Sequence, residues 1–175
     1  FSNFLSSKGL NLIFGKIFTQ DILGIYERSS RVKDIPSEFL AKIINKVMFP
    51  VMSEIQDESE RLIKIYKFGL GLSNSIMIPT TVFLVFFSAE IVQILMGAKW
   101  SEAVAPLQIM LLVLTFSNSG KMTDAVIRAK GLIYKNVTRK YIFTIIIIVL
   151  SGALGYLYGI NGAAVGIVLS HFINY

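Results

Sequence analysis

The sequence predicts an all-α membrane protein, a polytopic bundle of about six transmembrane helices. Of its 175 residues, 54% are hydrophobic and only 16% are charged, whereas soluble domains carry about 25% charged residues. Three stretches contain no Asp, Glu, Lys or Arg at all: 68–89, 103–120 and 141–175. A bilayer core requires about 20 apolar helical residues, so these stretches indicate membrane spans and disfavour a disordered chain or a soluble enzyme.

The first two expected helices are interrupted by polar residues. The segment 2–26 carries Lys8, Asn11, Lys16 and Asp21 among its apolar side chains. A polar link at 28–34 follows, and Pro36 then begins a helix over 36–55, because the first turn of a helix accepts proline. In 36–55, apolar side chains recur at helical spacing on one side, and polar side chains occupy the other.

The remaining elements follow the apolar stretches. A charged connector or short surface helix is expected at 56–67, then a helix over 66–88 that contains Pro79, which lipid-embedded helices tolerate. A short continuation over 89–96 ends at Gly97. Three further segments complete the expected set: 101–127, 140–158, and, after a turn at 159–162, a sixth helix that begins at 163 and is cut short at 175.

Loop charge predicts the orientation of the bundle. The link 128–140 holds Lys and Arg but no acid, which places it in the cytoplasm by the positive-inside rule. Counting back, 56–67 is cytoplasmic and 97–100 is outside, with Trp100 as an interfacial aromatic. The link 28–34 would then lie outside despite its basic residues, so the orientation of the first two helices stays open. The net charge of +6 thus indicates topology and not nucleic-acid binding.

An ordered set of short motifs covers nearly the whole chain. In order they are Leu12-Ile13-Phe14-Gly15-Lys16, Leu23-Gly24-Ile25-Tyr26-Glu27-Arg28, Val47-Met48-Phe49-Pro50-Val51-Met52-Ser53, Gln56-Asp57, Glu60-Arg61-Leu62, Met96-Gly97-Ala98-Lys99-Trp100, Ala105-Pro106-Leu107-Gln108-Ile109 and Arg128-Ala129-Lys130-Gly131. The set resembles the Wzx-type oligosaccharide flippases, the polysaccharide transporter branch of the multidrug/oligosaccharidyl-lipid/polysaccharide flippase superfamily. The chain departs from its relatives at Lys130, where they more often have Leu.

The resemblance implies a fold and a function. Family members have two pseudo-symmetric lobes around a central cavity, and residues 1–175 resemble one lobe, helices seven to twelve, of a longer protein. Members of the family move undecaprenyl-diphosphate-linked sugar units across the cytoplasmic (inner) membrane for surface polysaccharide synthesis. The implied partners are this lipid-linked oligosaccharide, the bilayer and the missing N-terminal lobe. No nucleic acid, cofactor, metal or enzymatic activity is expected.

Polar residues inside the spans are the candidate substrate contacts, because a charge at the bilayer centre costs about 2.5 to 3.5 kcal/mol and must face protein or water. Lys42 and Lys46 form a basic stripe beside Asn45, and Lys8 and Lys16 form another. A diphosphate that leaves water needs such donors, so we hypothesise a cationic cavity. Two alternatives are an ion pair between Glu38 and Lys42 and lysines that reach the membrane interface.

A second candidate set lies at the end of the fourth segment. Asn118, Lys121 and Asp124 recur at three-residue spacing and are expected to share a polar face that holds sugar hydroxyls. The alternative is a simple Lys121–Asp124 ion pair at the cytoplasmic boundary. His171 is expected to be a buried hydrogen-bonding group, and Asn74 an interhelical contact. Glycines at small-xxx-small spacing, such as Gly162 and Gly166, indicate helix packing, and no catalytic or metal-binding motif is present.

Other functions remain open at this point. A drug or cation exporter of the related MATE branch requires acidic residues in its cavity, whereas the spans here offer mainly Lys. An integral membrane polymerase or ligase of the same pathway requires a large outer loop with Arg and His, and the expected outer loops are short. A structural helical subunit has no use for interior lysines. A flippase half that rocks against a second lobe fits the sequence best.

Overall fold

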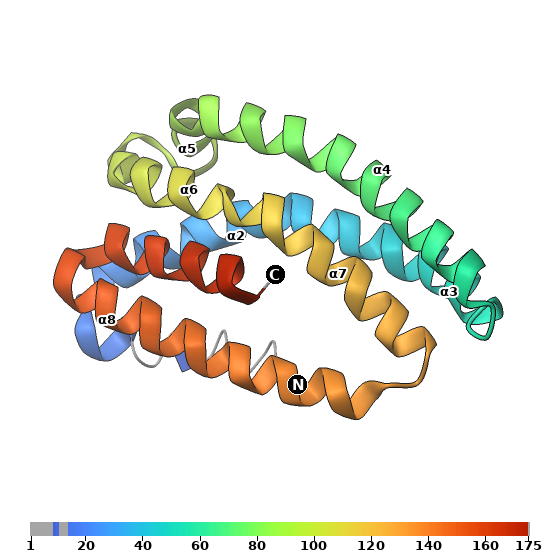
Figure 1. Cartoon of the computed structure of the whole chain (residues 1–175). Helices are drawn as coiled ribbons and strands as arrows, with labels where there is room; N and C mark the ends of the chain where they lie inside the picture. The colour runs from blue at the N-terminus through green and yellow to red at the C-terminus, as the bar shows by residue number, and fades with distance from the viewer. Residues whose placement is uncertain (1–8, 11–13, 175) are drawn as a thin grey trace.

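The structure is a computed structural model that describes residues 9–10 and 14–174, and within that part it is all-helical (Figure 1). Lys8 and Asn11 of the first expected segment lie outside the described residues. The elements are α2 (Gln20–Ile43), the π-helical η1 (Ile44–Met48), α3 (Phe49–Glu54), α4 (Ser59–Phe86), α5 (Ser88–Met96), the 3₁₀-helical η2 (Ala98–Ala103), α6 (Val104–Leu111), α7 (Val113–Ala129) and α8 (Ile133–Asn174).

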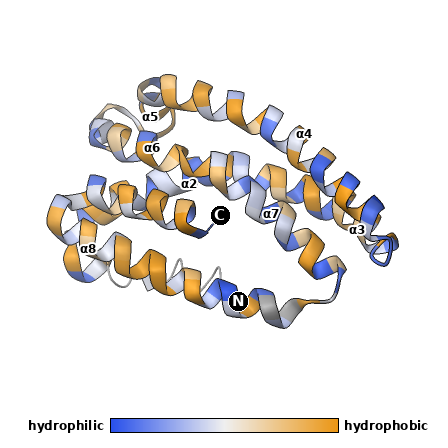
Figure 2. Cartoon of the chain, in the orientation of Figure 1, coloured by the Kyte–Doolittle hydropathy of each residue, from blue (hydrophilic) through white to orange (hydrophobic). Residues whose placement is uncertain are grey.

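Two described helices, α4 and α8, are long and apolar enough to cross a membrane, and the pair Ala98–Leu111 and Val113–Ala129, bent by 44° at its break, makes a third if the two helices form one span. Their outward side chains are large and apolar, for example Phe86 at 78% exposure and Ile145 at 62%, and hydrophobic residues run along both α4 and α8 (Figure 2). Soluble monomeric proteins rarely expose apolar surfaces this extensive to water. The all-α transmembrane bundle is confirmed.

Helix α8 is a hairpin of two antiparallel arms, which Figure 1 shows folding back at one end of the bundle. The reversal occurs at Gly159, whose φ of 67° and ψ of −155° lie outside the helical region and are open only to glycine. The arms then pack closely, because a Cβ on Gly162 would meet the Leu154 carbonyl and one on Gly166 would meet the Ser151 backbone. The small-xxx-small packing is confirmed, and the expected turn shortens to one residue.

The first long helix differs from the prediction. Residues 20–54 form one continuous helical rod, α2–η1–α3, so the expected polar link at 28–34 and the helix start at Pro36 were wrong. The chain turns earlier, at Phe18 and Thr19. Because α2 packs along α6, α7 and η2, its neighbours hold the helix through a proline and several charges. Since residues 28–34 are not a loop, their basic residues no longer conflict with the positive-inside rule. The orientation of the bundle in the membrane stays a prediction.

The π-helical turn η1 has a local cause in Pro50. Proline has no N–H, and its ring clashes with the carbonyl four residues earlier, which here belongs to Lys46. The wider turn avoids that arrangement, since the Phe49 N–H donates to the carbonyl of Ile44, five residues back. Single π turns inside α-helices occur often at functional sites, and this one contains Asn45 and Lys46.

Other boundaries shift by a few residues. Helix α4 begins at Ser59, so most of the expected charged connector is its first turns, and the helix runs through Pro79 as expected. Helix α5 ends at Gly97, whose φ is 91°, as the sequence indicated. Helix α8 begins at Ile133, well inside the expected loop 128–140.

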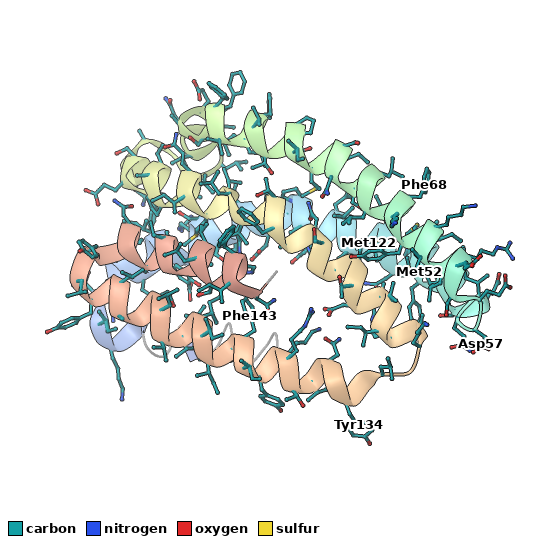
Figure 3. The ribbon with its side chains drawn as sticks, viewed as in Figure 1. Met52, Asp57, Phe68, Met122, Tyr134 and Phe143 are labelled. Atoms are coloured by element: carbon teal, nitrogen blue, oxygen red, sulfur yellow. The ribbon has the colours of Figure 1, made fainter. Side chains whose placement is uncertain are left out.

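Helix α7 lies at the centre of the lobe and contacts α3, α4, α6 and α8. Met52 of α3 and Met122 of α7, both labelled in Figure 3, belong to one buried cluster, and both side chains are fully buried. Gly69 of α4 leaves room for the methyl groups of Met48 and Met122. This packing fixes the rotation of α7, and so decides which of its polar residues face inward.

Candidate functional site

A polar chamber lies inside the lobe between α2, α7 and both arms of α8. Its cavity volume is about 290 Å³. The polar and charged residues that line it are Tyr26, Ser30, Lys33, Asp34, Ser37, Ser117, Lys121, Asp124, Arg139, Lys140, His171 and Asn174. The lining includes four lysine or arginine side chains and two carboxylates, so the chamber has an excess of positive charge.

Lys121 and Asp124 both line the chamber, but they have different partners. Lys121 Nζ donates to the Ser37 carbonyl at 2.9 Å and also to the Ser37 hydroxyl. Asp124 forms ion pairs with Arg139 at 3.1 Å and Lys140 at 2.8 Å. The alternative of a Lys121–Asp124 ion pair is therefore wrong. Asp124 instead ties α7 to α8, and Lys121 ties α7 to α2.

Asn118 does not share the face of Lys121 and Asp124. Its side chain is fully buried, and its amide has no hydrogen-bond partner among the described residues. The reason is geometric, because a three-residue step turns a helix by about 300°, so two such steps separate Asn118 from Asp124 by about 120°. The expected shared face therefore holds for Lys121 and Asp124 only, and a contact of Asn118 with sugar stays a prediction.

Lys42, Asn45 and Lys46 lie outside the chamber, on the exposed side of α2 and η1. The Asn45 side-chain oxygen accepts a hydrogen bond of 2.6 Å from Arg128 of α7, and the Arg128 guanidinium lies 4.9 Å from the centre of the Phe49 ring. No ion pair joins Glu38 to Lys42 in the described part of the chain. The two lysines thus face away from this lobe.

Lys16 is exposed and lies before α2, away from the chamber lining, and Lys8 lies outside the described residues. His171 packs edge-on against Phe143 with 5.0 Å between ring centres, and its Nδ1 lies 2.9 Å from the Ile167 carbonyl. Figure 3 labels Phe143 on the first arm of α8. His171 is therefore a hydrogen-bonded group of the interior, as expected, although it also lines the chamber. The Asn74 side-chain oxygen is buried without a partner among the described residues.

Several residues that line the chamber were not expected from the sequence. Ser30, Lys33 and Asp34 were assigned to a link, and Ser37 to the helix expected over 36–55, although the three- and four-residue spacing of all four is that of one helix face. Arg139 and Lys140 were assigned to a cytoplasmic loop. Had residues 20–54 been interpreted as one helix, this spacing would have placed Ser30, Lys33, Asp34 and Ser37 on one face.

Comparisons with known proteins identify a family and relatives of this chain. The family described as "Polysaccharide biosynthesis protein" matches residues 1–105. The lipopolysaccharide biosynthesis protein WzxC of Escherichia coli K12 is 28% identical over 98% of this chain and 35% of its own length. An uncharacterized membrane protein in the cps region of Klebsiella pneumoniae is 27% identical over 98% of the chain and 36% of its own length.

The chain thus spans about a third of the length of these relatives. No solved structure matches it. The family match covers more than half of the residues, in a helical bundle with membrane-spanning segments. The chain therefore belongs to the polysaccharide biosynthesis protein family, with Wzx-type flippases as its kin.

Proposed function

We propose that the chain is one lobe of a transporter that moves polyprenyl-diphosphate-linked oligosaccharide across the cytoplasmic membrane by alternating access, without covalent catalysis. One observation carries this proposal. Four exposed basic side chains, Arg28, Arg31, Lys42 and Lys46, lie on α2 and η1. At about 100° per residue they fall within about 60° of one another around the helix axis. We call this surface the basic face.

The basic face cannot lie against lipid. Helix α2 packs against α4, α6 and α7, which belong to membrane-spanning segments, yet charges facing the bilayer core are costly and in membrane proteins face protein or a water-filled cavity. The chain spans about a third of its relatives, so the rest of the protein is available to face this surface. A wet cavity between two lobes satisfies the basic face, and binding sites of transporters lie at such interfaces.

The charge of this face selects the substrate class. A diphosphate is stabilised by charge-assisted hydrogen bonds from Lys and Arg, which offset the cost of removing it from water. Between the two basic pairs, the face carries Glu38 as its acidic residue, together with apolar Ile35 and Phe39. This excess of bases disfavours a cation exporter, for which acidic residues are needed.

The test is transport by the full-length protein in proteoliposomes that contain lipid-linked oligosaccharide. We expect the double variant Lys42→Ala/Lys46→Ala to lower the transport rate at least about tenfold, since each lost charged hydrogen bond is worth about 1.5 to 3 kcal/mol. Lys64→Ala/Lys67→Ala is the matched control, because both lysines are exposed and belong to α4 and not to the basic face. Transport at the wild-type rate in the first variant, with normal membrane insertion, would remove the basic face from the mechanism.

A further inference from the structure

A second pocket lies at the beginning of α2, at the opposite end of the basic face from Lys42 and Lys46. Its volume is about 420 Å³, and its lining combines two arginines, one carboxylate and the only tryptophan of the sequence. The lining residues are Gly24, Glu27, Arg28, Arg31, Val32, Leu95, Met96 and Trp100. We call it the Trp–Arg pocket.

The pocket is built by close packing between α2 and η2. The Trp100 ring lies against Gly24, where a Cβ would already be in van der Waals contact with the ring at 3.5 Å. One helical turn later, the Arg28 guanidinium lies over the same ring, with its carbon 4.2 Å from the ring centre. The Lys99 ammonium lies 5.8 Å from that centre. The indole thus holds one guanidinium at a fixed place and adds a second cation nearby.

Stacking leaves the hydrogen-bonding capacity of Arg28 unused. A guanidinium that packs by its face on an aromatic ring keeps its five N–H donors, which all lie in its plane. Within the described residues, neither Arg28 nor Arg31 donates a hydrogen bond to a side chain or forms an ion pair. The pocket thus offers two guanidinium groups, and stacking on Trp100 fixes the position of the one that belongs to Arg28. Such groups suit phosphate oxygens, which Arg binds in a bidentate manner.

The spacing of the two basic pairs relates this pocket to transport. From the midpoint of Arg28 and Arg31 to that of Lys42 and Lys46 is about 22 Å along the helix, at 1.5 Å per residue. This is a large part of the hydrocarbon thickness of about 30 Å. The basic face therefore offers donors at two levels about 22 Å apart, with apolar Ile35 and Phe39 between them.

We infer that the Trp–Arg pocket is a second binding site for the diphosphate of the lipid-linked sugar, occupied at the opposite membrane boundary from Lys42 and Lys46. This inference rests on the proposed function. Arg28 and Arg31 bind the phosphate oxygens, and Trp100 holds Arg28 in place. The head group thus exchanges one pair of basic residues for another as it crosses.

The experiment uses the full-length protein in nanodiscs, with tryptophans outside this chain replaced by Phe so that emission reports on Trp100. Inorganic pyrophosphate is titrated. We expect a saturable change in Trp100 emission, and an apparent Kd at least about tenfold weaker in Arg28→Gln/Arg31→Gln. The matched control Lys64→Gln/Lys67→Gln, which has the same spacing on α4, should keep the wild-type Kd. A wild-type Kd in Arg28→Gln/Arg31→Gln, or no change in Trp100 emission on adding pyrophosphate, would overturn the inference. Trp100 would then be only an anchor at the membrane interface.

Transport assays of the same variants separate the inference from the proposed function. We expect Arg28→Gln/Arg31→Gln to slow transport of lipid-linked oligosaccharide at least about tenfold while Lys42 and Lys46 are intact. Transport at the wild-type rate in this variant overturns the second site and leaves the proposed function standing. Absence of transport by the wild-type protein, with Trp100 still responding to pyrophosphate, overturns the proposed function and supports the pocket as an anion site.

Discussion

The ion pairs of Asp124 are expected to be a main tie between α7 and α8. Asp124 lies 3.1 Å from Arg139 and 2.8 Å from Lys140, and its side chain is only 23% exposed. Replacing Asp124 by Asn removes the negative charge and leaves two cations close together. Loss of one partner of a fully buried pair costs about 3 to 5 kcal/mol, and exposed pairs are worth about 0 to 1 kcal/mol.

Because this cluster is intermediate in exposure, we expect Asp124→Asn to lower the free energy of unfolding by about 2 kcal/mol. For a lobe of this length that unfolds as one unit, that corresponds to a fall in its Tm of roughly 4 to 8 °C. The assay is thermal unfolding of the full-length protein in detergent, followed by fluorescence. A Tm within 1 °C of wild type would refute the assignment of Asp124 as an interhelical tie.

A control and a second variant sharpen this test. Asp34 also forms an ion pair, with Lys33 at 2.9 Å, but the two residues are sequence neighbours on α2 and the Asp34 side chain is 45% exposed. Asp34→Asn should therefore change the Tm much less than Asp124→Asn. Adding Lys140→Gln to Asp124→Asn removes one of the two cations that surround residue 124, and should recover part of the lost stability.

Two further predictions concern packing. Gly166→Leu should destroy the α8 hairpin, because a Cβ there would lie 2.5 Å from the Ser151 Cα, whereas Gly71→Leu meets open space on α4 and should keep the fold; the yield of folded protein in gel filtration compares the two, and equal yields would contradict the packing. Asn45→Ala removes the acceptor of the 2.6 Å hydrogen bond from Arg128 and should cost about 1 to 2 kcal/mol. Thermal unfolding measures that loss, and an unchanged Tm argues against a role for the contact in holding η1.

The location of the membrane spans was predictable because the bilayer core excludes charged side chains that lack protein or water beside them. A segment without charges can cross the bilayer, and a segment with them needs protein or water beside it. The uncharged stretches therefore corresponded to α4, to α6 with α7, and to α8. Helix α2 was not recognised as one rod, because proline and clustered charges end helices in water, whereas neighbouring helices hold α2 through both.

The candidate site was predictable only where helical spacing was applied within a correct element. Lys121 and Asp124 were found because α7 was expected to be helical, but extending the same three-residue step to Asn118 ignored the rotation that accumulates with each step. Lys33 was missed because its segment was taken as a link, and Ser37 because it was taken as the first turn of a separate helix over 36–55. The partners of Asp124 come from α8, and contacts between helices cannot be read from the spacing along one of them.

The central claim is that the basic face lines a water-filled cavity. Its most direct test is chemical labelling of single cysteines in the full-length protein made cysteine-free, a background that this chain already provides. Lys42→Cys and Lys46→Cys should react with a membrane-impermeant maleimide, as residues in water do, whereas Ile76→Cys on the exposed apolar side of α4 should not. If neither Lys42→Cys nor Lys46→Cys reacts faster than Ile76→Cys, the claim is contradicted.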